Sequence, residues 1–509
     1  MIKNSKAKRG AKNVIYGLLQ QLITLSFGLL LPRLFLVSYG SEINGLVSSV
    51  THIYVYIALL EAGVGTATLQ ALYRTQSKKD YESANAIMAA TNQYYKRTGL
   101  FYLFAIIVFA ITYPLFIKTE INTLTVISII ILNGLGGCIS FFFQGKFRIL
   151  LQAEGKSYIL SNLASIIFLL NSATKILLIQ MGFSIIIVQM TYFILCIIQM
   201  VFIEIYVKKH CSWLNLNVNP DYASINQKNS VLIHKIAEMV FSNTDILILT
   251  LFCGLKIVSV YTMFITFYNM IKSILYNFLD GLNFNLGQTY HENKIKYERM
   301  FDIFEIYYMA LTFALYTILH IFIIPFMKIY TRGIADINYI DLYLPILFTT
   351  IYLLQGGRGP CSLVINHAEH FSITQWRSIV EAIINLVVSL ILVNLIGIYG
   401  VLIGTIAALF YRANDIIIYT NKKILERSPL ITYRRYFRNL FIFLLFILID
   451  NIIKYEYHNY LVLLKGAILA SLITLTTYVS INAIAEKEAF RIICKRILMI
   501  TSKSLKREY

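Results

Sequence analysis

The residues of this sequence that could do chemistry are charged side chains inside long apolar segments. Arg33, Lys175, Lys272 and Arg358 each lie within a stretch that is otherwise rich in apolar residues. A charge at the centre of a bilayer costs at least about 2.5–3.5 kcal/mol, so these side chains should face a wet cavity or one another. Cations around one cavity would attract an anion, and the planar arginine fork suits phosphate or diphosphate. The four residues are therefore candidate substrate-binding residues.

Three further charges lie at depth, and two of them are acidic. Asp245 ends a short polar sequence within an apolar segment. Arg377 and Glu381 are one helical turn apart, so they share a face and could pair with each other. This pair fits a structural role as well as a substrate site. Other cations lie close to segment ends, where their side chains should reach the membrane interface; these are Lys96, Arg97, Lys235 and Lys328.

Glycine and proline interrupt two of the apolar segments at matching positions. These residues loosen a helix, and paired interruptions point to a binding site between two structural repeats. They predict hinges, although glycines in the earlier segment would equally allow close helix packing. The hinge candidates are Gly134, Gly136, Gly137, Gly356, Gly357, Gly359 and Pro360.

The sequence carries no motif of an enzyme, a cofactor site or a metal site. It lacks HExxH, GxSxG and the phosphate-binding P-loop. The six cysteines and eight histidines are scattered without ligand spacing, and the cysteines suit apolar packing. We therefore expect no enzymatic activity, no cofactor and no bound metal.

The elements that must position these residues are membrane-spanning helices. The chain of 509 residues is 58% hydrophobic with a mean hydropathy of +0.67, above the needs of a water-soluble core. A bilayer core of roughly 30 Å takes about 20 apolar residues as a helix, and a membrane barrel would need shorter alternating strands. Fourteen helical spans are predicted, at 13–38, 43–72, 98–117, 123–145, 157–182, 183–207, 231–254, 257–282, 303–330, 340–366, 371–397, 398–420, 437–455 and 459–485.

The net charge of +19 follows membrane topology and does not predict nucleic-acid binding. If the first span enters from the cytoplasm, the inside segments hold 31 of the 45 Lys and Arg residues. The outside segments hold four, which are Lys118, Lys256, Arg332 and Lys454. This asymmetry is the positive-inside rule. It predicts that both termini are cytoplasmic and that anionic lipids attract the basic segments.

Two polar breaks divide the predicted spans. We expect a first lobe at 1–207, a cytoplasmic linker at 208–230 and a second lobe at 231–421. A second linker at 422–436 would precede a helix pair at 437–485 and a basic cytoplasmic tail at 486–509. Two equal six-span halves are typical of duplicated transporters.

Four segments resemble a known family. They are SYGSEINGL at 38–46, LEAGVGTA at 60–67, SNTDILI at 242–248 and GLKIVSVY at 254–261. Together with the basic N-terminal stretch, they resemble the polysaccharide flippases of the multidrug, oligosaccharidyl-lipid and polysaccharide (MOP) exporter superfamily. The resemblance covers nearly the whole chain.

This resemblance implies two six-helix lobes around a central cavity, with two appended C-terminal helices. It implies alternating access in a bacterial cytoplasmic membrane, moving an undecaprenyl-diphosphate-linked glycan from the inner to the outer leaflet. The partners would be the lipid-linked oligosaccharide, membrane lipids and other polysaccharide assembly proteins. Because the family is thought to use ion gradients, Asp245 is the candidate coupling carboxylate.

Other functions stay open. A drug or cation extruder of the same superfamily would need carboxylates in its cavity, whereas the deep charges here lean basic. A polysaccharide polymerase or ligase resembles proteins with a large external loop, and the predicted outside loops are short. A lipid scramblase or a scaffold subunit of a glycan assembly complex is a further alternative.

Overall fold

The computed structural model describes residues 2–58, 64–78, 80–225, 229–453 and 457–492, and all regular structure in these ranges is helical. Ten helices among them are long and apolar enough to cross a membrane. This confirms an all-helical, multi-pass membrane protein, while the count of fourteen spans stays a prediction. Part of the segment 60–67 and the predicted tail beyond residue 492 lie outside the described ranges.

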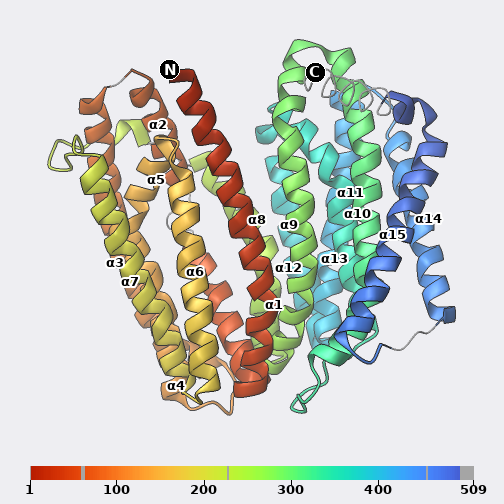
Figure 1. The fold of residues 1–509 in the computed structure, drawn as a ribbon, viewed down its shortest axis with the longest axis horizontal. Helices are drawn as coiled ribbons and strands as arrows, with labels where there is room; N and C mark the ends of the chain where they lie inside the picture. Colours follow the sequence, from red (N-terminus) through yellow and green to blue (C-terminus); the bar gives the residue numbers. More distant parts are fainter. Residues whose placement is uncertain (1, 59–63, 79, 226–228, 454–456, 493–509) are drawn as a thin grey trace, which may run out of the picture. The chain divides into compact units, whose positions relative to one another are not determined.

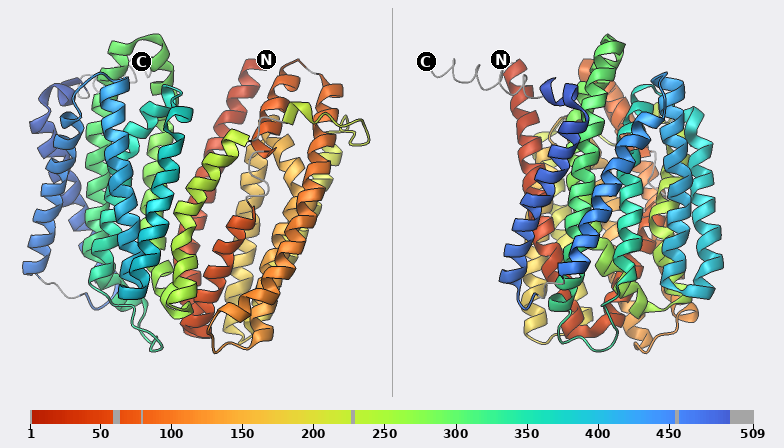
Figure 2. Two further views of the ribbon diagram at one scale, coloured as in Figure 1. Left: turned by 180° about the vertical axis from the view of Figure 1, so that it is seen from behind. Right: turned by 90° about the vertical axis from the view of Figure 1, so that its right-hand side faces the viewer.

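The chain forms two compact units (Figures 1 and 2). The first unit comprises residues 1–262 and 333–337, and the second comprises the rest. The helices that belong wholly to the first unit are α1 (Ile2–Ile57), α2 (Val64–Lys78), α3 (Tyr81–Phe116), α4 (Thr123–Ile139), α5 (Gly145–Ala153), α6 (Ser157–Gln180), α7 (Ile185–His210) and α8 (Asn229–Phe252), with the short turns η2 (Ser140–Gln144) and η3 (Ala223–Ile225).

The second unit begins within α9 (Leu255–Glu292), whose residues 255–262 still belong to the first. In the second unit α10 packs against α11, α14 and α15. α13 packs against α11 and α12. The expected lobe boundary at 208–230 stays a prediction. The remaining elements are α10 (Lys294–Tyr330), α11 (Tyr343–His367), α12 (Phe371–Ile396), α13 (Ile398–Tyr419), η4 (Thr420–Ile424), α14 (Leu430–Ile453) and α15 (Tyr460–Ala485).

α1 turns sharply at Gly40, so it contains two helices (Figure 1). Gly40 has φ +81°, a conformation that favours glycine because it has no Cβ. The Ser41 amide and hydroxyl donate to the two carboxylate oxygens of Asp336 at 2.7 and 2.8 Å. Asp336 therefore caps the helix that follows the turn, where a negative charge also suits the helix dipole. Glu42, in the same first turn, accepts hydrogen bonds from Thr119 and from the amide of residue 120.

Most helix bounds fall within a few residues of the predicted spans, but four helices begin earlier. α1 begins at Ile2, where the span was predicted from 13. α3 begins at Tyr81, α10 at Lys294 and α14 at Leu430, where the spans were predicted from 98, 303 and 437. The first turns of α3 and α10 are polar, and Arg434 and Arg435 follow closely in α14, so hydropathy does not detect these starts. Side chains fix two of these starts, because Asp80 accepts from the Ser83 amide and Asn293 from the Lys296 amide.

Three other predicted spans have different ends. The span predicted to end at 282 continues in α9 to Glu292. The predicted span 43–72 is helical to Ile57, and the next helix, α2, begins at Val64. The span predicted to end at 145 continues through the π-helical turn η2 and α5 to Ala153. This continuation places Arg148, which the charge pattern assigned to the cytoplasm, within a helix.

The described part of the predicted linker 208–230 folds onto the start of α3. The Asn85 side chain donates to the Trp213 carbonyl at 3.1 Å and accepts from the Asn215 amide at 2.9 Å. The Trp213 ring lies 5.0 Å from that of Tyr81. Further along, the Ser224 hydroxyl donates to Asp221 and lowers the pKa of this carboxyl. The segment is thus anchored to the first unit.

Candidate functional site

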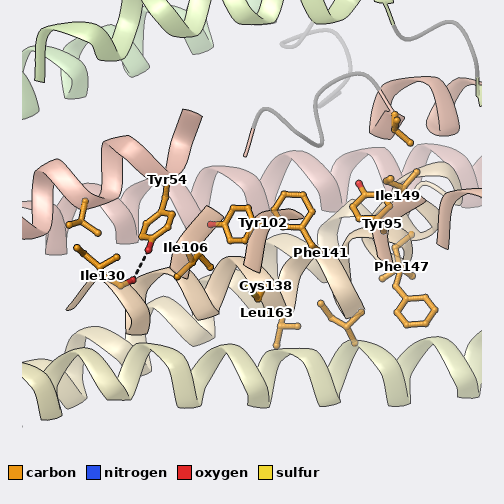
Figure 3. Close-up of a cluster of buried hydrophobic side chains, with 14 of the residues drawn as sticks. Tyr54, Tyr95, Tyr102, Ile106, Ile130, Cys138, Phe141, Phe147, Ile149 and Leu163 are labelled. Carbon is orange, nitrogen blue, oxygen red and sulfur yellow. Dashed lines mark hydrogen bonds between the residues drawn. The ribbon is translucent and has the colours of Figure 1, made fainter. Parts of the chain in front are cut away.

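The glycines of α4 accommodate tyrosine rings. A Cβ at Gly134 would lie 2.5 Å from the Tyr54 hydroxyl, and one at Gly137 would lie 2.2 Å from that of Tyr102. Gly136 similarly faces Tyr192 at 2.7 Å. Figure 3 shows Tyr54 and Tyr102 in this core, with Tyr54 donating to the Ile130 carbonyl at 2.6 Å. α4 is a continuous α-helix through these glycines, which allow close packing of the tyrosine rings. The irregular part of this segment is the π-helical turn η2, which follows them.

α11 is likewise unbroken through Gly356, Gly357, Gly359 and Pro360. A Cβ at Gly356 would lie 2.3 Å from the Thr312 methyl of α10, and one at Gly357 would lie 2.5 Å from the Tyr436 ring of α14. A Cβ at Gly359 would come 3.2 Å from Tyr308. Small residues thus let α10 and α14 approach α11 closely. The hinge role of both glycine groups stays a prediction.

Three helices of the second unit bring five charges together, and we call this group the arginine cluster: Arg358 of α11, Arg377 and Glu381 of α12, and Arg412 and Asp415 of α13. Arg358 donates to Glu381 at 2.7 Å, and Arg412 lies 3.5 Å from the same carboxylate. Asp415 accepts from Arg377 and from Arg412, both at 2.6 Å. With three cations and two anions, the cluster carries one net positive charge.

The arginine cluster differs from the sequence prediction in its pairing. Arg377 and Glu381 share a face of α12, but each bonds to a neighbouring helix instead of to the other. Arg377 also lies 4.6 Å from the Tyr419 ring and 5.6 Å from the Trp376 ring, which adds cation–π attraction. Arg412 was not among the predicted site residues because it falls in the segment whose basic residues were assigned to the cytoplasm.

A second ionic group joins α10 to the two C-terminal helices, and we call it the α14 clamp: Asp302, Glu305, Arg427, Arg435 and Glu486. Glu305 is fully buried and accepts hydrogen bonds from Arg435, from Thr432 at 2.7 Å and from Arg427 at 3.0 Å. Arg435 also contacts Asp302 at 2.7 Å and Glu486 at 3.3 Å. Arg427 and Arg435 lie in a basic segment that the charge pattern assigned to membrane topology, so the sequence pattern did not indicate this group.

In the first unit, Asp245 lies within a polar seam between α8 and its neighbours. It is buried and accepts from the Tyr261 hydroxyl at 3.0 Å. Close by in sequence, Asn243 bonds to His52 of α1 at 2.8 Å. Hydrogen bonds between helices hold spans together where lipid offers no hydrophobic drive.

The other predicted cations are distributed over both units. Arg33 on α1 and Lys175 on α6 are half-buried in the first unit, and Lys272 on α9 is exposed in the second. The Lys175 ammonium lies 5.6 Å from the centre of the Phe35 ring. The structure therefore joins Arg358, Arg377 and Glu381, while a cavity shared by Arg33, Lys272 and Arg358 stays a prediction. No group of three metal-binding side chains occurs within the described ranges.

Comparisons with known proteins support the fold. No protein-family model and no curated protein matches the sequence. Among solved structures, the lipid II flippase MurJ in an inward closed conformation is similar with a TM-score of 0.63 and 12% identity, over 92% of this chain and 98% of that one. An inward-facing multidrug resistance MATE family transporter of the MOP superfamily has a TM-score of 0.61 and 17% identity, over 81% and 98%.

A third similar structure is a Vibrio cholerae MATE transporter, with a TM-score of 0.55 and 15% identity over 85% of this chain and 99% of that one. At these identities the comparison establishes the fold alone. The chain therefore has the fold of MOP superfamily transporters, and its solved neighbours are transporters and flippases.

Proposed function

We propose that this protein flips an undecaprenyl-diphosphate-linked oligosaccharide from the inner to the outer leaflet of a bacterial cytoplasmic membrane, for surface polysaccharide assembly. The observation that carries the proposal is the extent of its likeness to the lipid II flippase, 92% of the chain against 81–85% for the MATE transporters. The difference of 7–11% corresponds to about 36–56 of the 509 residues, and the segment 430–485, which forms α14 and α15, has 56. The two C-terminal helices expected from the family resemblance fit this difference.

The charge pattern also supports an anionic substrate. On this proposal Arg33, Lys175, Lys272 and Arg358 contact the diphosphate, and lobes 1–207 and 231–421 alternate access about the glycines of α4 and α11. Arginine suits a diphosphate because its fork donates two hydrogen bonds to one phosphate group. Membrane lipids and other polysaccharide assembly proteins would be the partners, and Asp245 would couple an ion gradient.

The proposal includes fourteen spans with both termini in the cytoplasm. Reporter fusions at Lys209, Lys294 and Lys423 should therefore score as cytoplasmic, and fusions at Lys118 and Lys256 as external. The physical reason is the excess of basic residues in the predicted inside segments. Reversed results at two or more of these sites would contradict the topology.

The role of Arg358 can be separated from its pairing with Glu381. We expect Arg358→Ala to lower surface glycan by at least about tenfold at normal membrane abundance, since a buried ionic contact with diphosphate is lost. Arg358→Lys should recover part of the export because the charge returns without the fork. Arg33→Ala and Lys272→Ala should also reduce export. The measurement is surface glycan relative to quantified protein in the membrane.

The double variant Arg358→Ala/Glu381→Gln is the matched control. If Arg358 only neutralises Glu381, removing both charges should restore export. If Arg358 binds the diphosphate, the double variant should stay defective. Normal export by the Arg33, Lys272 and Arg358 alanine variants would sink the anionic-substrate proposal.

A drug extruder of the same superfamily is the second candidate, because MATE transporters share this fold. A cationic drug would need acidic contacts, and Asp245 and Glu381 are the deep carboxylates that could supply them. Asp245→Asn and Glu381→Gln should then abolish drug resistance conferred by the protein. Resistance that is absent from the unaltered protein would remove this candidate.

A further inference from the structure

A cavity of about 300 Å³ lies beside the first turns of α10 and shares no residue with the arginine cluster or the α14 clamp. α10 lines it with one helical face, because Lys296, Arg299, Met300 and Ile303 are spaced i, i+3, i+4 and i+7. Ile492, in the short helix that follows α15, adds an apolar side chain. Small-molecule sites occupy roughly 300–1,000 Å³, so the cavity is large enough for a small ligand group.

The lining divides into a cationic part and an apolar part along α10. Lys296 and Arg299 supply the cations nearer the start of the helix, and Met300 and Ile303 supply apolar side chains further along. Both cations are exposed, and neither forms an ion pair with a residue in the described ranges. Glu298 lies between them in sequence but does not line the cavity. The cavity therefore presents two positive charges next to an apolar surface.

The α14 clamp fixes the chain on both sides of this cavity and neutralises the carboxylates that lie close to it in sequence. Asp302 and Glu305 of α10 lie on either side of Ile303, and arginines of the clamp contact both. Glu486, six residues before Ile492, also contacts an arginine of the clamp at 3.3 Å. These acids therefore have cationic partners of their own, and the two cations of the cavity are left to meet an external anion.

The position of the two cations along α10 matches the depth of lipid headgroups. The apolar span was predicted to start at 303, and Arg299 and Lys296 lie four and seven residues before it. At about 1.5 Å per residue, they are about 6 and 10 Å beyond the start of the span. The headgroup layer extends roughly 5–8 Å beyond the hydrocarbon core on each side, and long basic side chains reach along such distances. A lipid phosphate would meet the cations while its acyl chains pass the apolar lining.

We propose that Lys296 and Arg299, with Met300 and Ile303, form a site for the headgroup phosphate of an anionic phospholipid from the surrounding leaflet. Charge complementarity selects an anion, and the apolar lining, which a free phosphate ion would leave unused, selects a lipid. Residues 493–509 are a poor alternative occupant, because they carry five Lys and Arg residues and one acidic side chain. The inference goes beyond the proposed function, because it assigns a resident lipid and does not depend on the transported substrate.

Lipid binding to the purified full-length protein in detergent tests the site without transport. The probes are dioctanoyl phosphatidylglycerol, dioctanoyl phosphatidylcholine and glycerol 1-phosphate, titrated calorimetrically at constant ionic strength. We expect phosphatidylglycerol to bind more tightly than either of the other two. Each interfacial cation contributes about fivefold to the affinity for an anionic lipid, so Lys296→Gln/Arg299→Gln should weaken phosphatidylglycerol binding by about 25-fold.

Lys422→Gln/Lys423→Gln is the matched control, because these cations of η4 are also exposed but do not line the cavity. It removes the same charge from the second unit, so the affinity for phosphatidylglycerol should stay nearly unchanged. The exchange variant Lys296→Arg/Arg299→Lys should retain binding, since both charges return to the cavity.

Each other outcome overturns part of the inference. An equal loss of binding in the two double glutamine variants would mean diffuse attraction to a basic surface, and no site. Unchanged binding in Lys296→Gln/Arg299→Gln, or no binding by the unaltered protein, overturns the site as well. Equal affinity for phosphatidylglycerol and phosphatidylcholine would contradict the selection of an anion. If glycerol 1-phosphate binds as tightly as phosphatidylglycerol, the site takes a free anion and the lipid assignment fails. Surface glycan does not enter the measurement, so failure of the proposed function would leave this result unaffected.

Discussion

Replacing Arg435 with methionine should destabilise the protein by about 3–5 kcal/mol, the usual cost of removing one partner from a buried ion pair. Arg435 is 5% exposed and contacts Asp302, Glu305 and Glu486. Without it, the fully buried Glu305 keeps Arg427 as its cationic contact in the α14 clamp. The attachment of α14 and α15 to α10 should weaken. The measurement is the midpoint of thermal unfolding of the purified protein in detergent.

Arg434→Met is the matched control, because Arg434 is the neighbouring arginine and is exposed. It should leave the unfolding midpoint nearly unchanged. Adding Glu305→Gln to Arg435→Met should restore part of the stability by removing the unbalanced buried charge. Equal midpoints for Arg435→Met and Arg434→Met would contradict the clamp.

Gly45→Ala should destabilise the first unit and lower the yield of folded protein. A Cβ at Gly45 would lie 1.8 Å from the Leu255 carbonyl oxygen, far inside van der Waals contact. Because this atom belongs to a backbone, no side-chain rotation relieves the clash, and α1 must move away from the start of α9. The nearby hydrogen bond from Asn44 to Ser259, 2.8 Å long, would break with it. Overpacking of this kind costs about 1–3 kcal/mol, and we expect the upper end of that range.

The measurement is the yield of monodisperse protein from membranes, together with its unfolding midpoint. Ser48→Ala is the control, one turn further along α1, where the substitution only removes a half-buried hydroxyl. Its yield should match that of the unaltered protein. A normal yield for Gly45→Ala would show that α1 and α9 tolerate separation.

The positions of most helices could be predicted because an apolar run is a local property of the sequence. The predicted span 157–182 and α6, Ser157–Gln180, agree within two residues. Helix starts such as Tyr81 and Lys294 could not be predicted from hydropathy, because their first turns are polar and are fixed by the capping residues Asp80 and Asn293. A capping hydrogen bond spans about three residues, so it does not show in a hydropathy value that is averaged over a longer stretch of sequence.

The candidate site was harder to predict because its partners lie on different helices. Helical spacing placed Arg377 and Glu381 one turn apart, but it could not indicate that Asp415 pairs with Arg377 and Arg358 with Glu381. Counting basic residues by segment also hid Arg412, which lies inside a helix and pairs with acids. A search for acidic residues near helix ends, such as Asp415, would have given a signal.

The cap at Gly40 has a consequence for biosynthesis. Ser41 and Asp336 are 295 residues apart in sequence, so the ribosome makes the amide long before it makes the carboxylate that binds it. At about 5–20 residues per second, the interval is about 15–60 s. During that time the helix that follows Gly40 lacks the Asp336 carboxylate that caps it, while the rest of the chain is still being inserted. Chains released before residue 336 should therefore lack this cap, even when every apolar segment made so far has been inserted.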